Sequence, residues 1–401
     1  MLHFDKLSMD EQLQVQRACA FLFSPEDSKN IDFLKTIDVK SVKTAFRRKA
    51  KMYHPDLNTG ENSVMIERRK ERFIKIRDSY ESLVSALPQE PKPVIWDVKK
   101  RKAKIIAVGG AKGGIGKSLF AVNMAVSLSK SGYKTIIADF DLGGANLHLY
   151  LGLTRINKSI NDFLNKKVEK IEDVFIKTDY GPILISGNSS SLGAANIHFS
   201  KKMRLINSIQ NLDADYVIVD LGGDTSYNML DFFNAADLNI VMTTCEPASY
   251  LDAYNFIKVA FLRRLTRHYN SDKQLGQESC SKLNTIINNY INENNGPVSK
   301  LMQVVKAEQP DAVNAFDKII ESYKPLLLIN KADGTSAPYE VSRRIMAVAE
   351  RMLSVCVETA KPIVFDKKIE ESARELIPVI TGHPESFLND YLSEFLKKYI
   401  I

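Results

Sequence analysis

The chain has 401 residues, of which 44% are hydrophobic and 26% are charged, a composition typical of globular domains with a sizeable core. No apolar run approaches the roughly 20 residues of a membrane span, and residues 1–12 lack the basic-then-apolar order of a signal peptide, so we expect a cytoplasmic protein. The four cysteines, at positions 19, 245, 280 and 356, form no CxxC pair, which argues against a disulfide framework and against an iron–sulfur or other cysteine-rich metal site.

The net charge of +7 belongs to the first quarter of the chain. Residues 1–104 hold 22 Lys and Arg against 15 Asp and Glu, which leaves 33 against 33 in residues 105–401. Because the larger part is balanced in charge, we expect no DNA partner for it, although Arg263, Arg264 and Arg267 could form a local basic patch.

Two amphipathic helices are predicted in a first domain, residues 1–87. The stretch IDVKSVKTAFRRKAKMYHPDLNTG, residues 37–60, places Val42 and Phe46 on an apolar face opposite a basic one. A second helix with its own apolar face follows at residues 71–84, ERFIKIRDSYESLV. The pattern predicts a small all-α domain.

The tripeptide His54-Pro55-Asp56 lies between these helices. Two helices around an HPD loop resemble a J-domain, the module that stimulates DnaK-type chaperones. The resemblance implies a DnaK-type partner contacted by His54, Pro55 and Asp56 and by the basic residues Lys43, Arg47, Arg48 and Lys51. The sequence departs from the family upstream, because residues 10–37 replace the usual short first helix. The alternative is a basic helical hairpin in which the HPD tripeptide is accidental or is a relic used only to bind partners.

A linker is predicted at residues 88–103, where three prolines break any helix and a basic run follows. Beyond it, short β-branched runs alternate with helical patterns over residues 104–401. This alternation predicts an α/β domain with a mostly parallel, doubly wound sheet. One polar segment with a helical pattern, at about residues 263–324, interrupts the rhythm and is predicted to be an inserted helical element.

The stretch KIIAVGGAKGGIGKS, residues 104–118, is predicted to run from a strand through a phosphate-binding loop into a helix, as in a P-loop NTPase. Glycines let backbone N–H groups face phosphates, Lys117 neutralises the β and γ oxygens, and the Ser118 hydroxyl ligates Mg²⁺. Ala111 replaces the first glycine of the usual motif. The predicted nucleotide-binding residues are Gly113, Gly114, Ile115, Gly116, Lys117, Ser118 and Leu119.

This loop contains one lysine more than that chemistry needs. KGGIGKS resembles the deviant Walker A motif, KGGxGK[ST], of the MinD/ParA family of dimeric ATPases. The resemblance implies that Lys112 is catalytic in an ATP-bound homodimer, where it reaches the partner's nucleotide. A second cation there would stabilise transition-state charge and make hydrolysis depend on dimerisation. The alternative is a solvated loop lysine.

Three aspartates at strand ends complete the predicted site. IIADFDLGGANLHLYLGL, residues 136–153, resembles the switch segment of MinD and its flagellar FlhG/FleN relatives. The resemblance implies that Asp139 lies near Mg²⁺ and that Asp141 orients the attacking water, with a helix cap as the alternative for Asp141. The strand in DYVIVDLGG ends at Asp220, the Walker B position, where a carboxylate can hold a water on Mg²⁺.

The sequence gives less direct evidence about which base the bound nucleotide carries. NKAD, residues 330–333, fits the NKxD motif with which GTPases read guanine, which would give Asp333 that role. ATPases of the MinD/ParA type often have an asparagine at this strand end whose amide can pair with adenine. From the resemblance of the longer motifs we predict Mg–ATP, with Asn330 as the base contact, and keep GTP as the alternative.

These predictions combine into a J-like domain joined to a nucleotide-switch ATPase that dimerises on ATP and hydrolyses it slowly under the control of a protein activator. The FlhG/FleN likeness suggests flagellar or polar positioning, by analogy alone. The first alternative is a chaperone adaptor, in which the nucleotide domain only selects the client, and the second is a GTP-binding assembly factor.

The C-terminal segment ESFLNDYLSEFLKKYII, residues 385–401, has an apolar stripe at helical spacing. We predict that this stripe packs in the core. The alternative is a reversible membrane contact of the kind made by MinD relatives, which would place the protein at the inner face of the membrane or at a cell pole.

Overall fold

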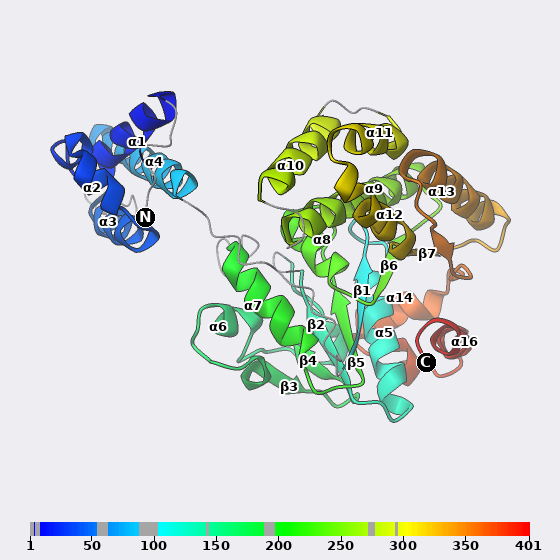
Figure 1. Cartoon of the computed structure of the whole chain (residues 1–401). Coiled ribbons are helices and arrows are strands. Elements are labelled where there is room, and N and C mark those ends of the chain that lie inside the picture. The colour runs from blue at the N-terminus through cyan, green and yellow to red at the C-terminus, as the bar shows by residue number, and fades with distance from the viewer. Residues whose placement is uncertain are drawn as a thin grey trace. The chain divides into compact units, whose positions relative to one another are not determined.

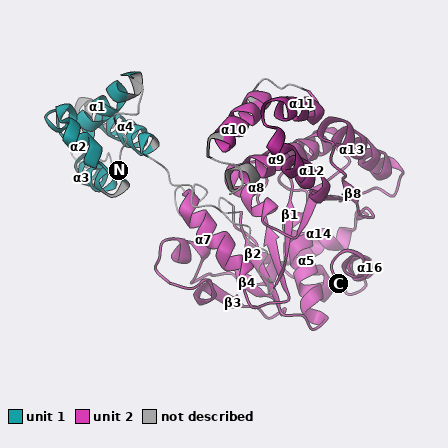
Figure 2. Ribbon diagram, viewed as in Figure 1, with its two compact units in different colours: residues 1–92 teal, residues 93–401 magenta. Residues whose placement is uncertain are grey.

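The chain divides into two units, Met1–Lys92 and Pro93–Ile401, which Figure 2 colours separately. The computed structural model describes residue 4 and residues 9–53, 63–87, 103–141, 144–187, 197–271, 277–292 and 296–401. The predicted linker, residues 88–103, lies outside this set except for Ala103, so the boundaries that we placed at 87 and 104 stay a prediction.

Packed helices form the smaller unit: α1 (Met9–Leu22), α2 (Ile31–Thr36), α3 (Val39–Tyr53) and α4 (Ser63–Ala86), with a 3₁₀ turn η2 (Asp27–Lys29). Its buried core includes Val15, Leu22, Leu34, Val42 and Leu83. Phe46 of α3 packs against Tyr80 of α4, with ring centroids 4.5 Å apart. The two predicted amphipathic helices are therefore present. The HPD loop lies outside the described residues, so the J-domain resemblance stays a prediction.

A mostly parallel sheet forms the centre of the larger unit, as the alternating pattern predicted. In the described residues it has eight strands in the order β3-β4-β2-β5-β1-β6-β7-β8, and only the β3–β4 pair is antiparallel. The strands are β1 (Lys104–Gly109), β2 (Thr135–Asp139), β3 (Phe175–Lys177), β4 (Ile183–Ile185), β5 (Tyr216–Asp220), β6 (Leu238–Thr243), β7 (Leu326–Ile329) and β8 (Glu358–Thr359). Parallel strands bring their carboxyl ends to one edge, where a ligand site is expected.

Helices cover both faces of this sheet (Figure 1). One face packs against α5 (Lys117–Lys130), α15 (Val379–Gly382) and α16 (Leu388–Tyr399), with α14 (Lys367–Glu375) beside α15. The other face packs against α6 (Ile160–Leu164), α7 (Phe199–Gln210), α8 (Tyr227–Asn234), α9 (Pro247–Ser271) and α13 (Ala337–Leu353). Short 3₁₀ turns are η4 (Leu149–Leu151), η5 (Ile171–Val174) and η6 (Pro310–Ala312).

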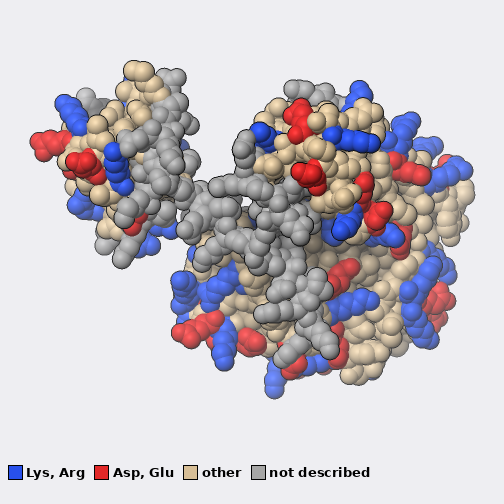
Figure 3. Space-filling model, viewed as in Figure 1, with Lys and Arg blue, Asp and Glu red and all other residues tan. Residues whose placement is uncertain are grey.

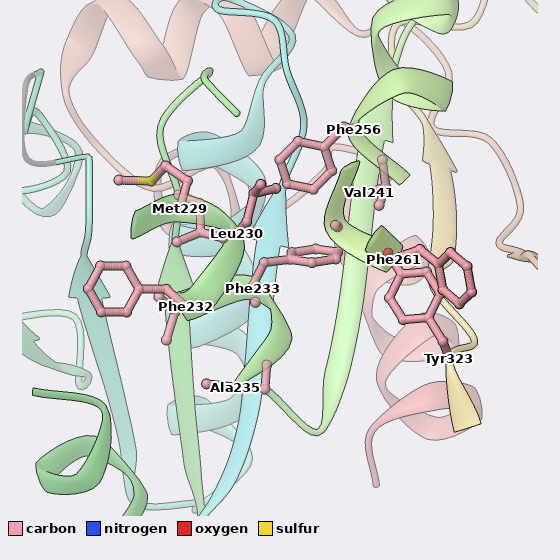
Figure 4. Close-up of a cluster of buried hydrophobic side chains, with 14 of the residues drawn as sticks. Met229, Leu230, Phe232, Phe233, Ala235, Val241, Phe256, Phe261 and Tyr323 are labelled. Atoms are coloured by element: carbon pink, nitrogen blue, oxygen red, sulfur yellow. The ribbon is translucent and has the colours of Figure 1, made fainter. Parts of the chain in front are cut away.

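The segment predicted as helical at about residues 263–324 contains the end of α9 followed by α10 (Gln277–Asn292), α11 (Val298–Glu308) and α12 (Val313–Ser322). Its buried side chains join the same core as α8 and α9. Figure 4 shows part of that core, with Met229, Leu230 and Phe233 of α8 beside Phe256 of α9. The helical character of the segment is confirmed, and its apolar residues belong to the main domain.

The C-terminal helix α16 packs in the core, as predicted. Leu388, Tyr391, Leu392, Phe395 and Leu396 are all buried. The Phe395 ring meets Phe120 of α5 edge-on at 5.4 Å. Its apolar stripe therefore contacts α5 in this arrangement. Among the described residues, none of the helices has the length and apolar character needed to span a membrane.

Candidate functional site

The glycine-rich loop between β1 and α5 has a backbone that other residues rarely adopt. Gly114 and Gly116 have φ angles of +74° and +97°, in the left-handed region. A Cβ on Gly116 would also lie only 2.4 Å from Asn330 Nδ2. Helix α5 begins directly afterwards at Lys117, and its first N–H groups have no partner within the helix. The loop therefore has the form of an anion-binding turn at a helix N-terminus.

Two side chains from the end of β7 hold carbonyl groups of this loop. Asn330 Nδ2 donates to the Ile115 carbonyl oxygen at 2.7 Å, and Lys331 Nζ donates to the Gly114 carbonyl oxygen at 3.2 Å. These two hydrogen bonds fix the orientation of the loop relative to the end of β7. Sequence reasoning predicted Asn330 as a base contact and missed this anchoring role, which pairs residues 215 positions apart.

Lys117 is 7% exposed and lies among carboxylates. Its Nζ donates to the Lys112 carbonyl oxygen at 2.8 Å. Burial lowers the pKa of Lys117, whereas the charges of Asp220, Asp141 and Asp224 act in the opposite direction. A buried ammonium at the start of a helix suits a phosphate group, which would add negative charge beside it.

Two buried carboxylates lie side by side at the ends of β2 and β5. The parallel register pairs Asp139 with Asp220, and their residues are 1% and 2% exposed. Asp139 accepts backbone N–H bonds from Asp141 and Leu147, both at 3.1 Å. Burial, and then the neighbouring Asp220 charge, raises the pKa of Asp139 well above its usual range.

Asp220 has a buried oxygen without a partner. Within the described residues its Oδ1 accepts no hydrogen bond, while the Ser118 hydroxyl bonds to the carboxylate. Burial raises the pKa of Asp220 to about 7, against the lowering effects of Ser118 and Lys117. An orphaned carboxylate oxygen beside a hydroxyl fits a divalent cation. No group of three or more His, Cys, Asp or Glu side chains in the described part of the chain could hold a metal, so further oxygens must come from a ligand or water.

Asp141 lies against the loop that follows β5. Its Oδ1 accepts the Gly144 N–H at 3.0 Å, and Gly144 lies in a turn, so this contact is not the helix cap that we gave as the alternative. The same carboxylate approaches Gly222 so closely that an added Cβ there would lie 3.1 Å from Oδ1. At Gly223 a Cβ would lie 3.0 Å from Gly113 N. The structure thus brings the predicted switch residue, the loop after β5 and the phosphate loop into contact.

Lys112 is not a free loop lysine. Its Nζ lies 2.7 Å from Glu246 Oε2, although the Glu246 side chain is 69% exposed. The hydrogen bond and the charge of Lys112 lower the pKa of Glu246, with a smaller contribution from Lys331. Glu246 directly precedes α9, and sequence reasoning did not identify it because 134 positions separate the pair.

A cavity of about 320 Å³ lies beside the loop, large enough for a small ligand. Its lining joins loop and helix residues to an apolar segment after β8: Gly114, Gly116, Leu119, Phe120, Asn330, Lys331, Ile363, Val364, Phe365, Asp366, Ile369, Glu370, Ala373, Arg374 and Leu388. Phe365 N–H donates to Ala332 O at 2.7 Å and holds that segment beside Asn330. Asp333 is not in the lining, and its Oδ1 accepts from the backbone and hydroxyl of Thr335.

Two other predicted features have different outcomes. His54, Pro55 and Asp56 lie outside the described residues, so their predicted chaperone contacts have no structural test here. The local patch of Arg263, Arg264 and Arg267 is corrected, because Arg263 and Arg267 both bond to the buried Asp231 and Arg264 lies over the Tyr323 ring. These arginines are held by contacts within the fold, and the side chains of Arg263 and Arg267 are only 17% and 16% exposed.

Comparisons with known proteins agree with this geometry. Residues 103–274 match the AAA domain family model. The chain is 34% identical over 167 residues to the flagellum site-determining protein YlxH of Helicobacter pylori, covering 40% of this chain and 54% of the relative. It is 29% identical over 158 residues to the antiactivator FleN of Pseudomonas aeruginosa, covering 39% and 56%. The chain thus spans about half the length of these curated relatives.

A solved structure extends the comparison to the fold. The septum site-determining protein MinD complexed with Mg-ADP, from Pyrococcus horikoshii, matches with a TM-score of 0.50 at 19% identity. The match covers 74% of this chain and 96% of the other. At this identity the likeness establishes the fold of the larger unit.

Protonation of Asp220 should make the stability of the ligand-free protein depend on pH. The pKa of Asp220 is raised from 3.8 to about 7 in the folded state. The contribution of this carboxyl group to the free energy of unfolding is therefore fully present below pH 4 and is lost as the pH rises through 7. We expect Asp220→Asn to melt several degrees higher than the wild type at pH 8, with the gap closing toward pH 4.

The same variant should lose stabilisation by Mg–ATP, because the carboxylate is then needed in its charged form. The exposed Asp179 provides the matched control, Asp179→Asn, which should change neither result. A pH profile of the melting temperature that is unchanged in Asp220→Asn would contradict the raised pKa.

Proposed function

We propose that this protein is an ATPase of the MinD/ParA type that binds Mg–ATP at the loop of residues 113–119 and dimerises on it. The match of residues 103–274 to the AAA domain family and the likeness to YlxH and FleN support this proposal. The observation that carries the proposal is the convergence of the loop, the buried pair Asp139 and Asp220, and a second loop lysine, Lys112, at one edge of the sheet. Slow hydrolysis set by a protein activator is part of the proposal.

Each residue has a role that its surroundings support. The backbone N–H groups from Gly113 to Leu119 face the phosphates, and Lys117 exchanges its bond to the Lys112 carbonyl for a phosphate oxygen. Ser118, Asp139 and Asp220 would hold Mg²⁺ directly or through water. When bound, the ion neutralises phosphate charge that develops during transfer.

Asp141 is proposed to orient the attacking water. Its carboxylate lies beside Gly222, at the start of the loop that approaches Gly113. A carboxylate that already accepts the Gly144 N–H is fixed in direction, which favours an orienting role over general proton transfer.

The cavity supports adenine over guanine. Asn330 lines it, whereas Asp333, the residue that would read guanine, bonds to Thr335 outside it. The apolar side chains of Val364 and Phe365 provide surfaces for a planar base. ATP is therefore the proposed nucleotide, and the GTP-binding assembly factor is the alternative that nucleotide competition tests.

Lys112 changes partners in the proposed cycle. In this structure its ammonium bonds to Glu246 of the same chain. For Lys112 to reach the phosphates of a partner subunit, that ion pair must open. Closing the dimer places the cation where charge develops, which makes hydrolysis depend on assembly.

Intracellular positioning of the flagellar or polar type is proposed from the likeness to YlxH and FleN, whose names describe flagellar site determination and antiactivation in those proteins. In this view the protein works in the cytoplasm and at the inner face of the membrane or a cell pole. Any membrane contact by α16 would require its buried apolar stripe to be released from α5.

A chaperone adaptor is the second candidate. Lys43, Arg47 and Arg48 of α3 are exposed, while Val42 and Ala45 of the same helix are buried. The helix thus presents the basic face that a J-domain would use toward a DnaK-type chaperone. In this reading the larger unit selects the client.

Nucleotide-dependent dimerisation provides the main test. We expect Asp141→Ala, which should slow hydrolysis, to double its mass in ATP and to remain a monomer in ADP or GTP, measured by light scattering. Adding Lys112→Ala should abolish the dimer while ATP binding, measured by fluorescence titration, is retained. A dimer in GTP alone would overturn the base assignment, and a mass that ignores every nucleotide would overturn the switch.

The Lys112–Glu246 pair should oppose dimerisation to a small extent. Because both side chains are partly exposed, we expect Glu246→Gln to tighten the ATP-dependent dimer of Asp141→Ala only about two- to fivefold, measured by analytical ultracentrifugation. The exposed pair of Glu340 and Arg344 provides the control, Glu340→Gln, which should have no effect. A weaker dimer in Glu246→Gln would show that Glu246 belongs to the dimer contact.

The adaptor is tested with purified DnaK-type chaperone. If it holds, the wild-type protein should stimulate chaperone ATP hydrolysis severalfold and Asp56→Asn should not, since the HPD aspartate is the proposed contact. ATP-dependent dimerisation should be equal in the two proteins. Equal stimulation by both would remove the chaperone role and leave the ATPase proposal intact.

A further inference from the structure

Where α7, α8 and α9 meet, positively charged side chains outnumber the negatively charged one that they contact. Asp231 of α8 is 4% exposed and contacts three cations: Lys202 of α7 and Arg263 and Arg267 of α9. Arg263 binds it in a bidentate fork, with Nε at 2.7 Å from Oδ1 and Nη2 at 2.9 Å from Oδ2. Burial alone would raise the pKa of Asp231, but the hydrogen bonds from Arg263 and Arg267 hold it well below its usual range. One carboxylate therefore faces three positive charges.

Asp231 also fixes the orientation of the Arg263 and Arg267 side chains. Arg263 and Arg267 each use Nε and Nη2 on Asp231. The side chains of Arg263 and Arg267 remain 17% and 16% exposed. Each guanidinium carries more N–H groups than it uses on Asp231 and is held in place by that buried anchor.

Two exposed aromatic rings lie on the same guanidinium groups. Arg263 Cζ is 4.3 Å from the centroid of the Tyr227 ring, and Arg267 Cζ is 4.6 Å from that of Phe199. Tyr227 is 70% exposed and Phe199 is 42% exposed, so both rings are available for contact. Aromatic residues and arginine are enriched among the residues that dominate binding at interfaces.

From this juxtaposition we propose that Phe199, Tyr227, Arg263 and Arg267 form a docking surface for an acidic segment of a partner protein. The surplus of positive charge attracts carboxylates, which accept in the plane of a guanidinium group. The exposed rings provide an apolar contact for a neighbouring side chain of the segment.

A protein segment fits this surface better than DNA does. Nucleic acid binding requires an extended basic stripe that follows many phosphates. On the face shown in Figure 3, basic and acidic side chains of the larger unit are interspersed. The two arginines are nearly buried and lie against aromatic rings, so they present few donors at a small, partly apolar site. This surface is distinct from the nucleotide site and goes beyond the proposed ATPase function.

The test uses the full-length protein and an array of twelve-residue peptides with Asp or Glu at alternate positions and Phe, Leu or Trp between them. A matched array carries Asn and Gln in place of the acids. We expect saturable binding to acidic peptides, at least tenfold weaker binding to their amide versions, and severalfold weakening between 50 and 300 mM salt, measured by fluorescence anisotropy.

Two variants with matched controls locate the binding. Tyr227→Ser and Arg267→Gln should each weaken the best acidic peptide fivefold or more. Tyr339→Ser, at a tyrosine that is 62% exposed on α13, and Arg344→Gln should leave it unchanged. Melting temperature and ATP affinity, measured on every variant, separate loss of docking from loss of folding.

Three results would overturn the proposal. One is equal binding by the two variants and their controls, and another is no preference of the wild type for the acidic array. The third is displacement of the peptides by a 20-base-pair duplex or by self-association that Tyr227→Ser abolishes, which would assign the surface to DNA or to a second copy of this chain.

Discussion

The site depends on how the carbonyl groups of one short loop are held. A loop that binds phosphate must turn its backbone N–H groups toward the ligand, which directs carbonyl groups the other way and leaves them in need of donors. Asn330 and Lys331 supply donors to the carbonyls of Ile115 and Gly114. Strand β7 therefore orients the loop before any ligand is present, and its contribution lies in preorganisation.

The second constraint is desolvation at the ends of β2 and β5. Parallel pairing places Asp139 opposite Asp220 with both carboxylates out of water, where two like charges are unfavourable. A raised pKa is the physical result in the ligand-free protein. A bound divalent cation would offset this repulsion, which is why the pair is proposed to hold Mg²⁺.

Local pattern carried most of the fold and the centre of the site. KGGIGKS, Asp139 and Asp220 lie in strand, loop and helix signals that are contiguous in the sequence, and topology then brings their strand ends together. Contacts between residues far apart in the sequence could not be predicted in this way. Lys112 with Glu246 joins positions 134 residues apart, and a single exposed Glu before a helix carries no signal in one sequence.

The cavity beside the glycine-rich loop was not predicted, for a related reason. Val364 and Phe365 follow β8 and resemble an ordinary apolar run in the sequence, and only their pairing beside Ala332 turns them toward the loop.

The contact of Asp231 with three cations was not predicted either, because the arginines resembled a surface patch in the sequence. Their partner lies about 30 residues away on α8, and a buried carboxylate between apolar neighbours cannot be distinguished from a cap without tertiary structure.

Helix α9 connects these features physically. Glu246 precedes the first turn of α9 and contacts Lys112. About 25–30 Å farther along the helix, at 1.5 Å per residue, Arg263 and Arg267 bind Asp231 of α8. Helix α8 in turn follows the loop of Gly222 and Gly223 that lies against Asp141 and Gly113. The loop lysine and the segment after β5 are thus tied to the two ends of one packed α8–α9 pair. A shift at either end would act on an element shared by the proposed nucleotide site and the proposed docking surface, and the two sites would then be coupled without direct contact.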